Sequence, residues 1–326
     1  EGKGRVHGCT EGQLSPELWG RIADGLVADD CSFDHIIFQW MGEPTLHPQL
    51  EDLVAIAAEK LVERVGYLRI DTNGILLTRQ RVKKLLESMS GKDVPLLVVF
   101  TLDAATAGTY EKVKGRPHFA QVVRNVRRFI GIRAQLGERC RVNVQVQMVV
   151  QPGNADEVGA FVAYWRDLFR CYGGPAWHDE IMLKRLSVGG GSEGQAAADD
   201  LYCRSVNDAG WTGKAGPIGG ANLVLWEQRP WQVDDGHTGA RGPCPGLWLT
   251  PVIRHDGKLH VCCADLHGEM VLGQLGVRGF RELWDGSMAR SLRAAHLEGR
   301  FEGVCAGCGG INWYAMPSGV SLPGPT

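Results

Sequence analysis

The sequence predicts an α/β protein: a partial barrel of the TIM type, followed by a small cysteine-rich domain. Over the first 186 residues, apolar segments typical of buried strands alternate with segments whose apolar residues recur at helical spacing. This alternation is typical of parallel strands joined by right-handed helical crossovers, with chemistry at the carboxyl ends of the strands. Two cysteine pairs then follow near the end of the chain. A doubly wound open sheet is the alternative architecture for the first part.

A helix is expected first, because Ser15 is a good N-cap and Pro16 suits the first turn. Five strands and the helices that connect them follow. The strands are expected at residues 35–40, 67–71, 96–102, 142–150 and 180–186, and the helices at 16–27, 50–62, 78–88, 119–136 and 155–171. This first domain is assigned to residues 1–186.

Residues 187–242 change character and are expected to form a glycine-rich linker with one possible strand at 222–226. Nine of the 32 residues from Gly189 to Gly220 are glycine, and glycine-rich segments are typical of loops. The cysteine-rich domain is assigned to residues 243–316. Its expected elements are a hairpin at 247–254 and 258–262 and helices at 280–284 and 287–297, and a Pro/Gly-rich tail follows at 317–326.

The composition excludes several classes of protein. A formal net charge of −2 over 326 residues gives no electrostatic footprint for nucleic acid. No run of 18 apolar residues suggests a membrane span, and the first residues do not resemble a signal peptide. We therefore expect a cytoplasmic protein whose ten cysteines are thiols and metal ligands rather than disulfides. A solvated helix face is expected for the basic residues Arg124, Arg127, Arg128 and Arg133.

The two cysteine pairs predict a metal centre. Cys244 and Cys262 form the first pair, and Cys305 and Cys308 form a C-x-x-C that can place two thiolates on one metal. Four thiolates are the ligand set of a 4Fe–4S cluster or of a structural zinc ion, and the spacing leaves both open. Neighbouring side chains on a strand point to opposite faces, so at most one of Cys262 and Cys263 is expected to face the metal. The other cysteines are expected to be small buried hydrophobes: Cys9, Cys31, Cys140, Cys171 and Cys203.

Polar turns follow three consecutive strands. They are Gly42-Glu43-Pro44, Thr72-Asn73-Gly74 and Thr101-Leu102-Asp103. Glycine lets the backbone pass close to a ligand, and proline fixes the turn. In the first turn, the exposed backbone groups and the glutamate are able to bind an ammonium group. Each turn is a weak signal alone, but their recurrence on consecutive strands predicts a ligand site.

These turns resemble those of radical S-adenosylmethionine (SAM) enzymes that carry a C-terminal SPASM or twitch domain. Residues 38–48 are similar to the "GGEP" segment of that family, whose backbone and glutamate hold the SAM amino group. Residues 71–74 and 101–103, with the loop at 110–116, are similar to the next strand ends. The resemblance implies SAM-binding roles for seven residues: Gly42, Glu43, Pro44, Thr72, Asn73, Gly74 and Thr101.

The cysteine-rich domain extends the resemblance to nearly the whole chain. Cys244, Gly257 and Cys262 match the first motif of a SPASM or twitch domain, and Cys305 and Cys308 match its last. The resemblance implies that these four cysteines hold an auxiliary 4Fe–4S cluster. Because no cysteine follows Cys308, the pattern resembles the single-cluster twitch form, as in 2-deoxy-scyllo-inosamine dehydrogenase, rather than the two-cluster form of anaerobic sulfatase-maturating enzymes.

The sequence departs from the family pattern at two points. Met41 stands where the family often has glycine, and the Gly-Glu-Pro core remains. The C-x-x-x-C-x-x-C motif, which binds the cluster that cleaves SAM, is absent, and Cys9 and Cys31 are too far apart to replace it. The resemblance therefore implies a (β/α)6 barrel lacking its first strand, in an N-terminally truncated fragment that is not competent for SAM cleavage. A second 4Fe–4S cluster is expected in the full-length protein.

The resemblance implies a radical SAM oxidoreductase or peptide-modifying enzyme. In the complete protein, a 5′-deoxyadenosyl radical would abstract hydrogen from a small-molecule or peptide substrate, and the auxiliary cluster would accept an electron. The expected partner is an electron donor such as flavodoxin or ferredoxin. No catalytic role is assigned to the residues near the last strand, which are expected at its surface: His178, Asp179, Glu180, Lys184 and Arg185. The alternatives are a zinc-binding, non-catalytic binding module and a degenerate relative without the first cluster.

Overall fold

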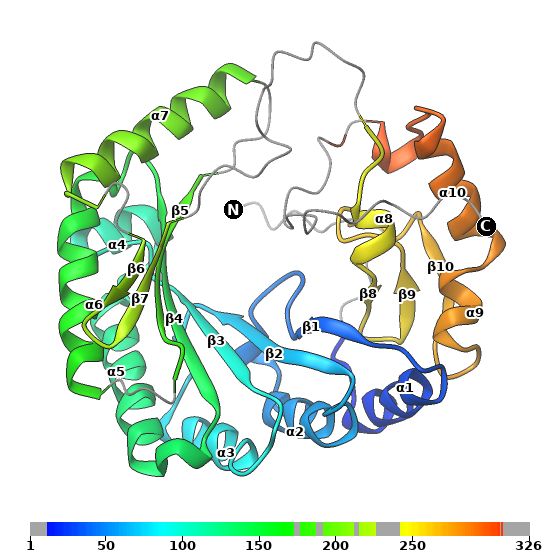
Figure 1. Ribbon diagram of the computed structural model, residues 1–326, viewed down its shortest axis with the longest axis horizontal. Helices are drawn as coiled ribbons and strands as arrows, with labels where there is room; N and C mark the ends of the chain where they lie inside the picture. Colours follow the sequence, from blue (N-terminus) through cyan, green and yellow to red (C-terminus); the bar gives the residue numbers. More distant parts are fainter. Residues whose placement is uncertain are drawn as a thin grey trace. The chain divides into compact units, whose positions relative to one another are not determined.

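The computed structural model describes residues 12–172, 177–186, 192–211, 215–225, 242–306 and 308. The chain groups into two compact units (Figure 1). Residues 33–226 form the barrel unit, and residues 1–32 together with 227–326 form the cysteine unit. The first helix, which was expected to belong to the barrel, therefore groups with the C-terminal elements.

The barrel unit is built on a seven-stranded sheet. Its strands are β1 (Phe33–Ile37), β2 (Val65–Thr72), β3 (Leu96–Thr101), β4 (Val142–Val150), β5 (Glu180–Arg185), β6 (Gly216–Ile218) and β7 (Ala221–Leu225). Their spatial order is β1-β2-β3-β4-β5-β7-β6, and only β6 runs antiparallel to its neighbour. A doubly wound sheet reverses its strand order at a switch point. The parallel strands here follow the chain order without a reversal, which confirms the predicted barrel-type α/β architecture.

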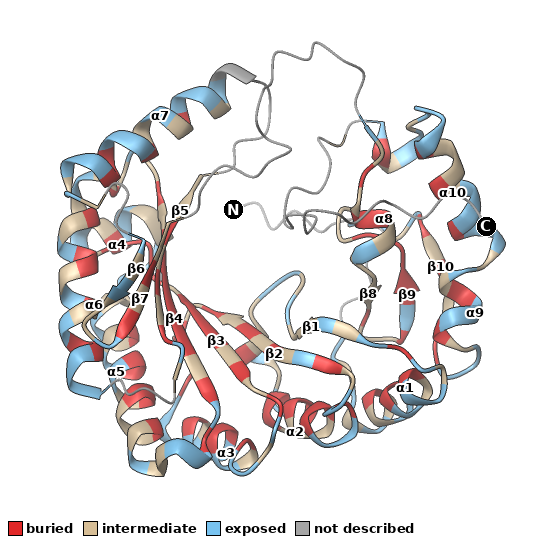
Figure 2. Ribbon diagram, viewed as in Figure 1, coloured by how far each residue is buried: buried red, intermediate tan, exposed pale blue. Residues whose placement is uncertain are grey.

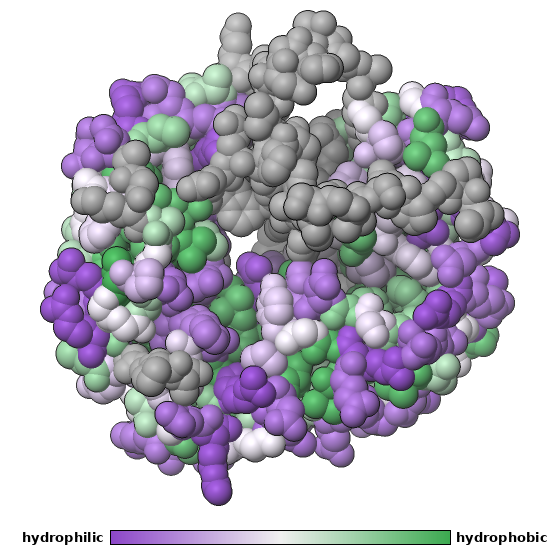
Figure 3. Space-filling model, viewed as in Figure 1, coloured by the Kyte–Doolittle hydropathy of each residue, from purple (hydrophilic) through white to green (hydrophobic). Residues whose placement is uncertain are grey.

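Helices cover one face of this sheet (Figures 1 and 2). They are α2 (Leu50–Lys60), α3 (Arg79–Ser88), α4 (Ala107–Lys114), α5 (Phe119–Leu136), α6 (Val158–Tyr172) and α7 (Ser192–Asp208), with the short turns η1 (Pro44–Leu46), η2 (Gly137–Arg139) and η3 (Ala155–Glu157). The core between helices and strands includes Leu68, Ile70, Phe100, Phe129, Phe161 and Trp165. Hydrophilic side chains, with smaller apolar areas between them, cover much of the visible surface of the described residues (Figure 3). No described helix combines the length and the hydropathy that crossing a bilayer requires.

The interval expected to be a glycine-rich linker contains regular structure. Helix α7 and strands β6 and β7 lie there, and β7 pairs in parallel with β5 as a sixth parallel strand. The glycines gather at the two ends of the counted window, whereas residues 195–209 contain none and are free to form a helix. The high glycine content of residues 189–220 as a whole therefore gave no indication of the helix. The expectation of an irregular region was therefore wrong where α7 and β6 lie, whereas the strand expected at 222–226 is present as β7.

Arg133 and Asp179 form a buried ion pair, although both were expected at the surface. Neither side chain has any exposed area. Asp179 accepts hydrogen bonds from the Arg133 guanidinium (Nη2–Oδ2 2.7 Å) and from the Val144 backbone N–H (2.8 Å). The Trp177 ring lies 4.3 Å from the guanidinium carbon. A buried charge is tolerated only when it is paired and hydrogen-bonded, so this pair ties α5 to the starts of β4 and β5.

The cysteine unit contains α1 (Pro16–Ala28) and the C-terminal elements. The latter are α8 (Gly246–Leu249), β8 (Val252–Ile253), β9 (Lys258–His260), β10 (Val271–Gln274), α9 (Phe280–Trp284), α10 (Ser287–Leu297) and η5 (Gly303–Cys305). Ser15 caps α1, since its hydroxyl accepts the Leu18 N–H (3.2 Å). After α1, the Asp29 carboxylate accepts the Arg281 backbone N–H (3.1 Å), which ties this helix to α9. The expected hairpin exists as β8 and β9, but its first residues form the short helix α8 instead of a strand.

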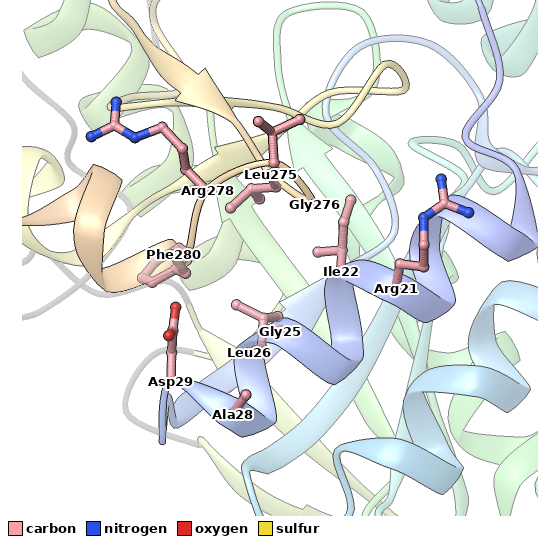
Figure 4. A pocket seen from close by; sticks show the side chains of 12 residues that line it. Arg21, Ile22, Gly25, Leu26, Ala28, Asp29, Leu275, Gly276, Arg278 and Phe280 are labelled. Carbon is pink, nitrogen blue, oxygen red and sulfur yellow. The ribbon is translucent and has the colours of Figure 1, made fainter.

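A pocket of about 360 Å³ lies between α1 and the segment from β10 to α9. Figure 4 shows Ile22 and Leu26 of α1 near Leu275 and Phe280, which supply its apolar lining. No cysteine lines this pocket. It is therefore a feature of the packing of α1 and is separate from the candidate metal ligands.

Candidate functional site

The Glu43 carboxylate joins two of the predicted ligand-binding turns. Its Oε1 atom accepts hydrogen bonds from the N–H (3.0 Å) and hydroxyl (2.5 Å) of Thr45 and from the Thr72 hydroxyl (2.5 Å). Its Oε2 atom accepts the Asn73 backbone N–H (2.8 Å). The turn after β1 and the turn after β2 are thus held together by one side chain, at the carboxyl ends of adjacent parallel strands.

The local sequence explains why the first turn forms. Gly42 has a φ of +94°, a conformation that glycine adopts without steric cost. Pro44 begins the 3₁₀ turn η1, and Glu43 is its N-cap. Arg81 of α3 then holds the segment from outside, because its guanidinium donates to the carbonyl oxygens of Thr45 and His47. Arg81 is a residue that sequence reasoning missed, since it lies more than 30 positions away and carries no motif of its own.

The second turn is equally constrained. Gly74 has a φ of +73°, and a Cβ atom there would lie 3.2 Å from the Phe100 ring. Its N–H donates to the Thr72 hydroxyl (3.0 Å), and its carbonyl oxygen accepts from the buried Asn125 side chain (2.9 Å). The Asn73 side chain accepts the Ile75 N–H (2.9 Å) in an Asx-type turn. The Thr72 hydroxyl, the Asn73 amide oxygen and both backbone polar groups of Gly74 are therefore held by defined contacts.

The segment after β3 is hydrogen-bonded to the end of β4. Asp103 adopts a φ of +57°, which is uncommon outside glycine. Its carboxylate accepts the Val149 N–H (2.6 Å) and pairs with Lys114 (2.5 Å), while its carbonyl oxygen accepts from the fully buried Asn154 (2.8 Å). The Thr101 hydroxyl lies 3.5 Å from the Thr72 carbonyl oxygen, at the limit of hydrogen bonding.

The structure thus brings the seven predicted SAM-binding residues to one edge of the sheet. Six of them belong to the two turns joined by Glu43, and Thr101 is their neighbour at the end of β3. Within the described residues, Oε2 of Glu43 accepts one hydrogen bond, and a carboxylate oxygen can accept two. This edge can therefore receive an additional donor such as an ammonium group.

The four predicted metal ligands all belong to the cysteine unit. Cys244, Cys262 and Cys305 are buried, and Cys308 is partly exposed. Cysteine thiolates are soft donors that suit iron or zinc. Within the described residues, no group of three His, Cys, Asp or Glu side chains is arranged so that it could hold a metal ion. The donor set fits a thiolate-ligated centre in chemistry, and binding would have to draw the sulfur atoms together.

Cys263 is a thiol that sequence reasoning set aside on a premise the structure does not support. Strand β9 ends at His260, so Cys262 and Cys263 lie in the loop beyond it and are not bound by strand alternation. A hydrogen bond with Cys262 lowers the pKa of Cys263, while the charges of Cys244 and Cys308 raise it. These interactions place Cys263 near three of the four predicted ligands.

Two buried histidines lie beside the cysteine loops. His296 of α10 accepts the Cys244 backbone N–H at Nδ1 (3.3 Å). His260 contacts Asp265 (Nδ1–Oδ2 2.8 Å), and Asp265 also accepts the N–H groups of Glu269 (2.7 Å) and Met270 (2.8 Å). Asp265 therefore organises the loop that follows Cys262. These contacts join residues that no local motif links, so the sequence offered no signal for them.

The remaining cysteines divide into two groups. Cys31 and Cys140 are buried as expected, and burial raises the pKa of the Cys140 thiol to about 11. Cys171 and Cys203 are exposed, so the expectation of burial was wrong for both. Each lies on a helix whose apolar face is formed by other residues. Cys9 lies outside the described residues.

The residues near β5 have different roles. Asp179 is the buried partner of Arg133, and the His178 backbone N–H donates to the Asn143 side chain (3.0 Å). Arg185 forms an ion pair with Asp199 of α7 (3.0 Å). This ion pair accounts for the position of the Arg185 side chain, and no bound ligand is needed to explain it. Glu180 is half-buried, and burial raises the pKa of its carboxyl group.

Two families match this chain. Residues 9–159 match the family described as "Radical SAM superfamily", and residues 244–309 match the SPASM family, described as "Iron-sulfur cluster-binding domain". The first match contains the three polar turns, and the second contains the four predicted metal ligands. Both sets of residues therefore lie within the matched segments.

The individual proteins that resemble this chain have low sequence identity to it. A curated protein of Pyrococcus furiosus, described as "Tungsten-containing aldehyde ferredoxin oxidoreductase cofactor-modifying protein", is 28% identical over 159 residues. The aligned region is 48% of this chain and 41% of that relative, so it spans less than half of either protein. A solved structure of anSMEcpe with bound AdoMet has a TM-score of 0.55 at 16% identity and covers 89% of this chain and 73% of its own. A structure of BtrN in complex with AdoMet and 2-DOIA has a TM-score of 0.45 at 15% identity and covers 93% and 82%.

Proposed function

We propose that this chain, which belongs to the radical SAM superfamily and carries a SPASM domain, binds SAM at the turns joined by Glu43 and is part of a modifying enzyme. Membership of the two families implies SAM and 4Fe–4S clusters as cofactors. The observation that carries the placement of SAM is the shared carboxylate: Glu43 holds the turns after β1 and β2 in one network.

The chain's own residues explain how the SAM amino group would be held. Oε2 of Glu43 already accepts the Asn73 N–H, and its second acceptor position suits an ammonium N–H. Charge favours the same contact, because a carboxylate attracts an ammonium group. Apart from the chain neighbours of Gly42, no heavy atom of the described residues lies within 4 Å of a Cβ built there, so the backbone can be approached closely.

The cysteine unit would hold the auxiliary cluster. We assign Cys244, Cys262, Cys305 and Cys308 as its ligands, on the spacing that the SPASM match contains. The Ala264 N–H donates to the Cys262 sulfur (3.2 Å), and such hydrogen bonds stabilise a thiolate and raise the potential of a bound cluster. When bound, a 4Fe–4S cluster supplies single-electron transfer.

The finer assignment is oxidation of a small molecule or modification of a peptide side chain, initiated by hydrogen abstraction. An electron donor such as flavodoxin or ferredoxin is the partner that this chemistry needs. The Pyrococcus furiosus relative, which is described as cofactor-modifying, supports the broader description as a modifying enzyme. A full ligand set of four cysteines favours electron transfer over direct binding of substrate by the auxiliary cluster.

SAM binding to the complete chain tests the placement. We expect Glu43→Gln to weaken SAM binding about tenfold or more, because the amide turns a donor towards groups that require an acceptor. Glu87→Gln is the matched control, since Glu87 is an exposed carboxylate on α3. Equilibrium dialysis measures both, with circular dichroism to check folding. Wild-type affinity in Glu43→Gln would exclude this placement.

The metal content of anaerobically purified protein tests the cysteine assignment separately. We expect bound iron and acid-labile sulfide, and visible absorption from iron–sulfur charge transfer. Zinc without sulfide would instead support the binding-module alternative.

A further inference from the structure

Three polar side chains lie side by side on the middle strands of the barrel unit. Gln145 of β4 pairs in register with Glu180 of β5, which pairs in register with Asn222 of β7. Residues paired in this way project to the same face of a sheet. The three side chains therefore form one row across three neighbouring strands.

This row lies on the face of the sheet that the helices do not cover. The charge of Glu180 acts on Arg69 and on Tyr67, which belong to β2. Two strands, β3 and β4, separate β2 from β5 in the sheet. Side chains so far apart along a sheet come within range of each other only across its concave side, so all of them face the interior of the curved sheet.

The row has no partners among the described residues. The structure gives no hydrogen bond or ion pair to the Glu180 carboxylate or to the side-chain amides of Gln145 and Asn222 within the described part of the chain. Gln145 is only 2% exposed. Arg69, whose charge acts on Glu180, donates two hydrogen bonds from one edge of its guanidinium, Nε and Nη2, to Asp71 (2.6 and 2.8 Å). Since buried polar groups are almost always hydrogen-bonded, the buried Gln145 amide requires a ligand or water. Glu180 and Asn222 are half-buried and are open to the same ligand.

We propose that Gln145, Glu180 and Asn222 bind a primary ammonium group of the substrate, an inference that rests on the function proposed above. The row offers three acceptor groups, two amide oxygens and a carboxylate, and an ammonium group carries three N–H donors. The Glu180 carboxylate supplies the negative charge that attracts a positively charged ammonium group. The substrate class is thus an amine, either a small aminated molecule or a lysine-like side chain with its ammonium in this row.

Other groups fit the row less well. A substrate carboxylate would be repelled by Glu180, and a hydroxyl has one donor and would leave two acceptors unpaired. A divalent cation prefers several charged oxygens, whereas this row contains a single carboxylate. The facing wall is neutral overall, because Arg69 and Asp71 pair, and it includes Tyr67 stacked on His35 (4.9 Å between ring centroids). That wall can pack against the uncharged part of an amine.

The site has a defined pH dependence. Burial raises the pKa of Glu180; Arg69 and His178 oppose that shift, and Asp179 adds to it. The carboxyl is fully ionised only above this raised pKa. Amine binding should therefore strengthen as the pH rises through the pKa of Glu180, and weaken only when the amine itself loses its proton, near pH 10 for an alkylamine comparable to lysine.

The probe for this site is n-butylammonium at millimolar concentration, observed by saturation-transfer difference NMR on the complete, anaerobically purified chain. Tetramethylammonium is the matched control, because it has the same charge and no N–H donor. We expect n-butylammonium to bind and tetramethylammonium to bind at least about tenfold more weakly. We expect Glu180→Gln to weaken n-butylammonium binding about tenfold and Asn222→Leu about fivefold, with Glu87→Gln unchanged.

The outcomes separate this inference from the proposed function. If SAM binds to the wild-type chain and n-butylammonium does not, the ammonium site is wrong and the function stands. If n-butylammonium binds and SAM does not, the ammonium site stands and the proposed function is wrong. Equal affinity in the wild type, Glu180→Gln and Asn222→Leu would overturn the site, as would displacement of n-butylammonium by SAM, which would assign it to the cofactor.

Discussion

The Glu43 carboxylate accepts a hydrogen bond of 2.8 Å from the Asn73 backbone N–H, 30 positions later in the chain. This contact connects two short turns, each of which is common in unrelated proteins. It also orients Glu43, because the same carboxylate accepts the Thr72 hydroxyl. A pair of weak sequence signals becomes one hydrogen-bonded network, and at the SAM site that we propose its acceptor groups are held in place in advance.

The Thr72 hydroxyl is expected to support both turns at once. It donates to Glu43 and accepts the Gly74 N–H, and Thr72 is only 2% exposed. Thr72→Val keeps the shape but leaves the Gly74 N–H unpaired, so we expect a loss of about 1–3 kcal/mol in the free energy of unfolding. Urea unfolding followed by circular dichroism measures it. Thr72→Ser, which keeps the hydroxyl, should lose less, and equal losses would contradict this role.

Gly74 should be intolerant of any side chain. Its positive φ strains every other residue, and a Cβ atom would also crowd the Phe100 ring. Gly91 has a similar φ of +75° but open space around its Cβ position, so Gly91→Ala isolates the backbone strain, about 1–2 kcal/mol. We expect Gly74→Ala to lower the thermal midpoint by more than Gly91→Ala. Equal shifts would show that the contact with Phe100 is unimportant.

The buried ion pair between Arg133 and Asp179 predicts a non-additive pair of substitutions. Asp179→Asn leaves the guanidinium buried without a counter-ion and should destabilise the protein by about 3–5 kcal/mol. Adding Arg133→Met removes that charge and should restore part of the loss. The exposed pair of Asp200 and Arg204 is the control, and Asp200→Asn should change stability by less than about 0.5 kcal/mol. Denaturant titration of the wild type, Asp179→Asn, Arg133→Met, the double variant and Asp200→Asn tests the expectation, and simple additivity of the two single variants would refute it.

Cys262 and Cys263 should differ in their effect on metal content. The spacing from Gly257 favours Cys262 as the ligand, although the charges of Cys244 and Cys308 act on Cys263. We expect Cys262→Ser to lose most of the bound iron and sulfide and Cys263→Ser to retain them. The exposed Cys171→Ser is the control. Colorimetric iron and sulfide assays after anaerobic reconstitution report the outcome, and the opposite result would transfer the ligand role to Cys263.

Much of the fold could be read from local patterns. Helix α5 and strand β4 begin and end at the predicted residues, as do α9 and α10. Periodicity and capping are properties of neighbouring residues, so they are visible without the fold. Helix α4 was not predicted because its apolar pattern is short: Tyr110 is the only buried residue that helical periodicity could have revealed in it. Its N-cap is Thr106, whose hydroxyl accepts the Thr109 N–H.

The misses at Arg133 and Glu180 involve partners that are distant in the sequence, and the miss at Cys263 involves the end of a strand. Arg133 looked like one of several solvated arginines, yet Asp179 makes it a core residue. Cys263 was set aside by a rule for strands, yet the strand ends three residues earlier. Glu180 looked like a surface residue at a strand end, and only the register with Gln145 and Asn222 reveals its row.

The sequence by itself determined the alternation of strands and helices, the polar turns at three strand ends and the spacing of four cysteines, because each is written in residues a few positions apart. Only the tertiary structure decided which of those features meet. Hydrogen bonds, ion pairs and rows of side chains form between residues that chain folding brings within a few ångströms, and a linear sequence carries no direct record of that distance.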